Sequence, residues 1–162
     1  SIERTYDRDT IDMEKLKNTL SAMGEKLAYQ LRMGNKLTGN VSVRIRYSDF
    51  KTYSKQIKVS YTNADHILIP TIQELFKKLH TRRLLIRLVG VRFTDLVGGH
   101  YQIDLFEDNE KTTNLYQSLD YIRNRFGCSS VFRASTLGVK SIRGNRNPFD
   151  GEPPILLAHR KQ

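Results

Sequence analysis

Two runs of alternating residues, joined by a short charged bend, constrain the fold more than any other feature of the chain. Over residues 41–47, apolar side chains alternate with Ser and Arg, and the alternation resumes over residues 53–61. Because successive side chains of a strand point to opposite faces, this pattern predicts strands with one buried face. The bend at residues 49–52 is short enough to join them as an antiparallel hairpin.

A long amphipathic helix is predicted before the hairpin. Over residues 12–33, Met and Leu side chains recur every three or four residues, which is the spacing of one helix face. Asp12 is expected to cap this helix, and Gly34 to follow its end. Ile11 and Leu16 are expected to form a hydrophobic staple at its start.

The remaining elements complete the order β-α-β-β-α-β. Apolar spacing over residues 67–79 predicts a second helix, in which Pro70 must produce a kink or mark the true start. The apolar run at residues 84–93 suits a central strand, and residues 2–6 supply a further strand. We therefore expect an α+β fold, with one four-stranded antiparallel sheet and both helices on one face.

The other face of this sheet is predicted to be basic. Period-two geometry sends Ser42, Arg44, Arg46 and Ser48 to the face away from the helices. The formal net charge of +10 and the pI near 9.8 favour a polyanionic partner, either nucleic acid or an anionic membrane surface. A two-stranded ribbon fits a DNA major groove, and Arg, Lys and hydroxyl side chains grip phosphates. The alternative is an ordinary solvated strand face.

Other features indicate the compartment. The chain has no apolar run of about 18 residues, and its first residues lack the order of a signal peptide, so we expect a cytoplasmic protein with no membrane partner. The single cysteine, Cys128, has no internal disulfide partner, which supports a reducing compartment.

Several short segments carry a family resemblance over about residues 1–134. They are SIERTYDRDTIDMEKL, VRIRYSDFKTYSK, RLVGVRFTDL, YQIDLF, DYIRNRFG and FRAS, and the most specific part is IRYSDFK at residues 45–51. Together they resemble the C-terminal little-finger domain of Y-family translesion DNA polymerases of the bacterial DNA polymerase IV type. The resemblance implies the same order of elements, contacts across the DNA major groove with template and primer backbones, and a linker to palm, fingers and thumb.

Double-stranded primer-template DNA is therefore the expected partner. We predict that one set of side chains holds the duplex backbone without reading sequence: Arg4, Arg44, Arg46, Ser48, Lys51, Thr52, Ser54, Lys55 and Arg92. The alternative is a non-catalytic, ferredoxin-like RNA-binding module, which would stack bases on aromatic side chains of its sheet face. Tyr47 and Tyr53 fall in the core register instead, which favours gripping of a duplex backbone.

The resemblance also implies that the parent protein is a DNA-directed DNA polymerase, a nucleotidyltransferase. Its catalytic carboxylates and their Mg²⁺ ions would lie in the palm, which precedes this domain. Asp7, Asp9 and Asp12 lie close together, but a strand exit followed by an N-cap accounts for them. The four histidines are scattered without ligand spacing. We expect no catalytic residue, metal or cofactor in this chain, and no activity from it alone.

Residues 102–106, QIDLF, resemble the pentapeptide by which bacterial polymerases dock on the sliding clamp. Gln102 would bond at the rim of the clamp pocket, while Leu105 and Phe106 would fill it. Ile103 departs mildly from the usual Leu. The alternative is that Leu105 and Phe106 end a strand and belong to the core.

The chain is expected to divide into four segments. After the little-finger domain comes an acidic loop with the clamp motif, then a helix with an extension, then a flexible basic tail: 1–97, 98–110, 111–137 and 138–162. Apolar residues spaced by three or four predict the third helix, which Gly127 would end: Leu115, Leu119, Ile122 and Phe126.

Overall fold

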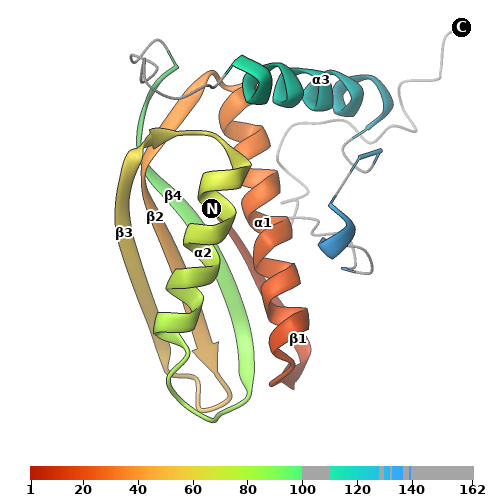
Figure 1. Cartoon of the computed structure of the whole chain (residues 1–162). Helices are drawn as coiled ribbons and strands as arrows, with labels where there is room; N and C mark the ends of the chain where they lie inside the picture. The colour runs from red at the N-terminus through yellow and green to blue at the C-terminus, as the bar shows by residue number, and fades with distance from the viewer. Residues whose placement is uncertain (100–109, 128–129, 132, 137–138, 140–162) are drawn as a thin grey trace, which may run out of the picture.

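The computed structural model describes residues 1–99, 110–127, 130–131, 133–136 and 139. Helices α1 and α2 lie side by side across one face of a sheet, and α3 crosses one end of this layer (Figure 1). The elements are β1 Ile2–Thr10, α1 Met13–Met33, β2 Lys36–Tyr47, β3 Thr52–Thr62, α2 Asp65–Leu79, β4 Ile86–Gly98, α3 Glu110–Phe126 and the short 3₁₀ helix η1 Ala134–Thr136.

The strands form one four-stranded sheet in the order β1-β4-β2-β3. Each neighbouring pair is antiparallel, so β4 and β2 are central while β1 and β3 are edges. This arrangement confirms the expected α+β fold with both helices on one face.

The central strands are longer than the side-chain alternation predicted. β2 begins at Lys36 and β4 ends at Gly98, and these two residues pair with each other. Within this extension, a Cβ on Gly39 would lie 2.6 Å from Asp95 Oδ2 and 2.7 Å from Tyr61 Cε1. Backbone hydrogen bonding therefore continues the two strands past the alternating pattern. The pattern itself is interrupted at Gly39, because the neighbouring side chains leave no room for a larger residue there.

The caps of α1 are those that the sequence predicts. The Asp12 carboxylate accepts backbone hydrogen bonds from Glu14 at 3.1 Å and Lys15 at 3.0 Å, and Gly34 is the C-cap. Ile11 remains 52% exposed, so its expected staple with the fully buried Leu16 stays a prediction.

Helix α2 begins at Asp65, which shows that Pro70 does not mark its start. Pro70 is the sixth residue of the helix and lies between the buried Ile69 and Ile72. It lies past the first turn, so it removes the backbone hydrogen bond that an N–H at this position would donate to His66 O.

The core lies between the two helices and the sheet. Its largest fully buried side chains come from all these elements: Leu16, Leu20, Met23, Val41, Val43, Ile45, Tyr47, Leu68, Ile72, Phe76, Ile86 and Val89. The apolar face that the alternation predicts for β3 is only partly covered, because Tyr53, Ile57 and Tyr61 are 37–38% exposed. They lie on an edge strand that the helices cover only in part, although Tyr53 still packs edge-on against Tyr47, with ring centroids 5.7 Å apart.

Helix α3 ends before Gly127 as expected, but the apolar row that predicts it is not its most buried face. Leu115 and Phe126 are 55% and 66% exposed, whereas Tyr116, Asp120 and Arg123 are buried. The helix packs through polar groups one position away from the apolar row. Periodicity therefore located the helix without identifying the face that packs.

Arg32 of α1 joins the three helices. It donates to Asp65 of α2 at 2.8 Å and to Asp120 of α3 at 2.6 Å. Burial acts to lower the pKa of Arg32, but hydrogen bonds and charge from Asp120 and Asp65 outweigh burial and raise it. Arg123 of α3 makes a second buried pair with Glu25 of α1 at 2.5 Å.

Replacing Arg32 with Met should detach α3 from α1 and destabilise the domain. The change leaves two largely buried carboxylates without their nearest cation, since Arg123 and Arg133 lie 3.8 and 4.0 Å away, and breaking a buried pair costs about 3–5 kcal/mol. Denaturant unfolding and amide hydrogen exchange of α3 measure both effects. Lys78→Met, which removes an exposed pair with Glu74 on α2, is the control and should leave stability nearly unchanged. Equal effects of the two substitutions would contradict a joining role for Arg32.

Candidate nucleic-acid interface

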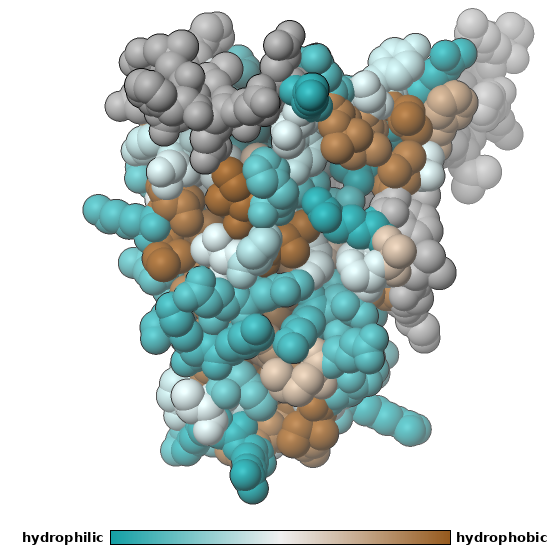
Figure 2. Space-filling model, viewed as in Figure 1, coloured by the Kyte–Doolittle hydropathy of each residue, from teal (hydrophilic) through white to brown (hydrophobic). Residues whose placement is uncertain are grey.

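The sheet face opposite the helices, here the open face, is built from alternate residues of the four strands. Figure 2 views the molecule from the helix side, where hydrophilic residues cover the middle of the helices, so the open face lies behind. Strand pairing places the following residues on the open face: Glu3, Thr5, Asn40, Ser42, Arg44, Arg46, Thr52, Ser54, Gln56, Lys58, Leu88, Gly90, Arg92 and Thr94.

These residues form rows across the sheet, perpendicular to the strands. Arg44 lies between Gly90 and Ser54 in one row. The row on one side contains Arg46 between Leu88 and Thr52, and the row on the other contains Ser42 between Arg92 and Gln56. Each of these rows combines an arginine with a hydroxyl, and such groups bind phosphate oxygens well.

Hydrogen bonds hold both arginines of β2. Arg46 Nε donates to Thr52 Oγ1 at 2.9 Å, and Arg44 Nη1 donates to Glu3 Oε1 at 2.8 Å. Arg44 nevertheless remains 46% exposed. Its guanidinium can therefore reach a partner in solution.

Most of the predicted DNA-binding residues lie on or beside the open face. Arg44, Arg46, Thr52, Ser54 and Arg92 belong to it by register. Ser48 and Lys51 lie in the hairpin turn: the Ser48 amide bonds to Leu85 O at 2.9 Å, and the Lys51 amide bonds to Asp49 Oδ1 at 3.0 Å.

Two predicted residues point to the helix side instead. Arg4 lies between the buried Ile2 and Tyr6 on β1 and pairs with Val89, and its guanidinium lies 5.7 Å from the Tyr6 ring centroid. Lys55 pairs with the fully buried Val43, so its side chain emerges on the helix side of the edge strand. Neither residue belongs to the open face, because each has the parity of the core positions, and their DNA contacts stay predictions.

The same parity identifies residues that the sequence analysis missed. Gln56 and Lys58 continue the row of Thr52 and Ser54 along β3. Counting every second residue from Thr52 would have found them.

Two further cations lie against aromatic rings beside the hairpin turn. Arg87 lies 4.7 Å from the Phe50 ring centroid, and Arg82 lies 5.5 Å from that of Tyr53. Phe50 is 64% exposed and has a φ of 62°. The spacing of residues in the sequence did not indicate these contacts. They join the hairpin to Arg82, which precedes β4, and to Arg87, which lies at the start of β4.

Two of the three N-terminal aspartates have structural partners. Asp12 caps α1, and Asp9 Oδ1 lies 3.9 Å from Arg87 Nη1. Within the described part of the chain, no group of three or more His, Cys, Asp or Glu side chains could hold a metal ion.

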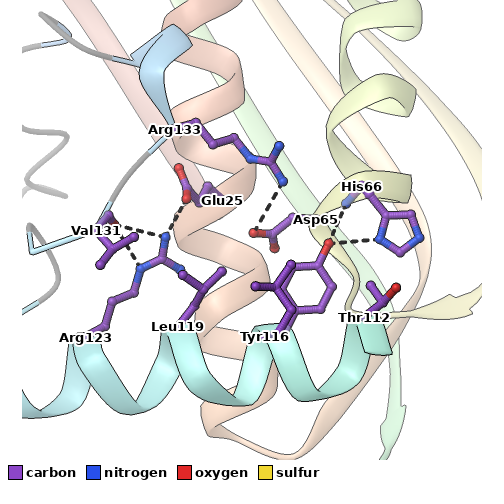
Figure 3. Close-up of a pocket in the computed structure, with 10 residues that line it drawn as sticks. Glu25, Asp65, His66, Thr112, Tyr116, Leu119, Arg123, Val131 and Arg133 are labelled. Carbon is purple, nitrogen blue, oxygen red and sulfur yellow. Dashed lines mark hydrogen bonds and ion pairs between the residues drawn. The ribbon is translucent and has the colours of Figure 1, made fainter. Parts of the chain in front are cut away.

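A cavity of about 500 Å³ lies where α3 meets α1 and the start of α2 (Figure 3). The Tyr116 hydroxyl contacts His66 Nδ1 at 2.9 Å and accepts its backbone N–H at 3.0 Å, and burial raises the pKa of Tyr116. Arg123 donates to Val131 O at 3.1 and 3.2 Å. The polar groups are largely committed to joining elements, so we assign this cavity no chemistry.

The sequence motif at residues 102–106 lies outside the described residues, as do Cys128, His100 and most of the predicted tail. The chain before the motif is held by a bond from Gly99 N to Asn35 O at 2.8 Å, and the chain after it enters α3. In the described part of the chain, none of the helices is both long and apolar enough to cross a membrane.

Comparison with known proteins gives a consistent result. The model of the impB/mucB/samB family C-terminal domain matches residues 1–105. DNA polymerase IV of Clostridium acetobutylicum is 34% identical over 141 residues, which cover 85% of this chain and 35% of that protein. DNA polymerase IV of Dehalococcoides mccartyi strain BAV1 is 31% identical over 144 residues, which cover 88% of this chain and 37% of that protein. The chain thus spans about a third of the length of these curated relatives.

A solved structure shares the fold. A post-insertion binary complex of Dbh DNA polymerase superposes with a TM-score of 0.50 at 18% identity, covering 59% of this chain and 28% of that one.

The register of β3 predicts unequal roles for its two lysines in duplex DNA binding. Lys58→Ala should weaken binding severalfold, because Lys58 lies on the open face beside Asn40. Lys55→Ala removes the same charge from the helix side of the strand and should have a much smaller effect. Fluorescence anisotropy with a labelled duplex measures both affinities. A larger loss for Lys55→Ala would place the interface on the other side of β3.

Proposed function

The chain belongs to the impB/mucB/samB family of C-terminal domains, the little-finger domains of Y-family DNA polymerases, and we propose that it is the DNA-binding domain of an error-prone DNA polymerase IV. In this role it grips the primer-template duplex along the major groove during translesion synthesis. The observation that carries this proposal is the open face, where arginine and hydroxyl side chains of β2, β3 and β4 form adjacent rows.

The chemistry of the open face favours backbone contact over base reading. Arginines and hydroxyls make charge-assisted bonds to phosphates that do not depend on sequence. An RNA-binding sheet would expose aromatic rings for stacking. In the rows from Asn40 to Arg46, the described open face contains no aromatic side chain, and the ring of Tyr53 lies on the helix side against Tyr47. A duplex therefore fits this surface better than unpaired bases.

Catalysis is proposed to lie elsewhere in the parent polymerase. Phosphoryl transfer needs carboxylates that hold Mg²⁺ ions, and we place these in a palm domain that precedes the little finger. In the described residues, Asp9 and Asp12 are engaged with Arg87 and the start of α1. The little finger would contribute DNA binding without catalytic residues or a cofactor of its own.

We also propose that the segment containing Gln102, Ile103, Leu105 and Phe106 docks on the bacterial sliding clamp. Two observations support this proposal: the motif itself, and the contacts that hold the chain on either side of it. Gly99 is bonded to Asn35, and Asp120 of α3 is paired with Arg32. Fixing both ends of a segment reduces the conformational entropy that it loses on binding. The motif would then be presented near the duplex that the open face holds.

Replacing Arg44 and Arg46 together with Ala tests the duplex grip. If the domain neutralises about five phosphates, log K should fall with log salt with a slope near −4.5, and the double variant should reduce that slope by about two. Binding should weaken alike for duplexes of different sequence. The matched control is Lys77→Ala with Lys78→Ala, which removes two exposed cations from α2. Loss confined to one DNA sequence, or an equal effect of the control, would reject the assignment.

Replacing Leu105 and Phe106 with Ala tests clamp docking. If both are anchors, each substitution should remove about 2 kcal/mol or more of affinity for the bacterial clamp in calorimetric titration, with the thermal midpoint unchanged. Asp108→Ala is a control next to the motif. A fall in thermal midpoint would indicate that the two residues belong to the core, and undiminished clamp affinity would refute docking through this motif.

A further inference from the structure

A carboxylate reaches across the centre of the open face. Glu3 of β1 pairs with Gly90 of β4, and Gly90 pairs on its other side with Arg44 of β2. Glu3 Oε1 accepts a hydrogen bond from Arg44 Nη1 at 2.8 Å. The ion pair therefore spans three neighbouring strands in a single row, from β1 to β2, and passes over β4 between them.

Gly90 provides the path for this contact. A Cβ at this position would lie 2.7 Å from Glu3 Cγ and 3.4 Å from Glu3 Cδ. Any side chain on Gly90 would thus displace the Glu3 side chain. The lack of a side chain at the middle of the row is what lets an acid on one edge strand reach an arginine two strands away.

The pair is placed where a phosphate would compete with it. Arg44 and Glu3 are 46% and 43% exposed, and exposed ion pairs of this kind are weak because water and salt screen them. A phosphate oxygen offers Arg44 the same charge and bond type as the carboxylate. A carboxylate bonded to Nη1 also repels a phosphate that approaches the same guanidinium. Among the described residues, Arg46 and Arg92 in the adjacent rows have no carboxylate within ion-pair distance.

We propose that Glu3 occupies Arg44 in place of a backbone phosphate in the unbound domain, and that DNA binding exchanges one partner for the other. Glu3 then acts on DNA binding through Arg44. It weakens the grip on DNA, and the row that contains Arg44 sets the strength of binding. This inference rests on the proposed DNA-binding function.

Glu3→Gln tests the exchange, because it keeps the shape of the side chain and removes its charge. Duplex affinity should rise about two- to fivefold, which lies within the range of about 1.4- to 5-fold that an exposed ion pair spans. The gain should be largest at low salt and should shrink as salt rises, since salt screens both the ion pair and the repulsion of phosphate. Anisotropy titrations over a salt series, with a labelled duplex of arbitrary sequence, measure both quantities.

Two controls separate the exchange from a general effect of charge. Asp7→Asn removes the same charge from an exposed position on β1 and should produce a clearly smaller gain. Glu3→Gln added to Arg44→Ala should produce no gain, because the cation for which Glu3 competes is absent.

Three outcomes would overturn the inference. Weaker binding by Glu3→Gln would mean that Glu3 holds Arg44 ready for DNA. An equal gain from Asp7→Asn, or a gain that persists without Arg44, would leave only general electrostatics. If the unaltered domain and all variants fail to bind a duplex, the proposed DNA-binding function itself is refuted, so the two failures are distinguishable.

Discussion

The structure depends on the burial of one sheet face beneath α1 and α2. Side chains such as Leu16, Ile72 and Phe76 meet Val43 and Val89 there, and all are fully buried. Because strand side chains alternate, each apolar residue committed to this layer sends its neighbour to the opposite face. The core thereby orients the arginines of β2 as a set. The basic face follows from the packing of the apolar one.

The order of strands then determines what each open-face residue can meet. β4 and β2 are central, so their residues have neighbours on both sides, while β3 is an edge whose side chains stay partly exposed. Gly90 lies at the middle of the face and allows Glu3 to reach Arg44. An acid in the first strand and a base in the second can pair in this way only because the last strand lies between them.

Helix α3 is attached by a different kind of contact from the rest of the fold. The whole helix lies beyond the residues that the family model matches, and it is held by contacts among Arg32, Asp120, Arg123 and Glu25. Buried ion pairs demand accurate geometry, because an unpaired buried charge is costly. These ion pairs therefore hold α3 in a defined position against α1 and α2. The apolar row of α3 is left largely to solvent at Leu115 and Phe126.

Local patterns in the sequence determined the order of elements, the Asp12 cap, the hairpin and the parity that places Arg44 and Arg46 on one face. Applied to every strand, the same parity would have placed Lys58 on the open face, and Arg4 and Lys55 on the helix side. Only the tertiary structure decided the strand order, the exposure of Tyr53 on an edge, the polar packing of α3 and the contact between Glu3 and Arg44. The physical reason is that periodicity records which side of an element is buried, whereas these contacts join residues far apart in the chain and depend on which elements become neighbours.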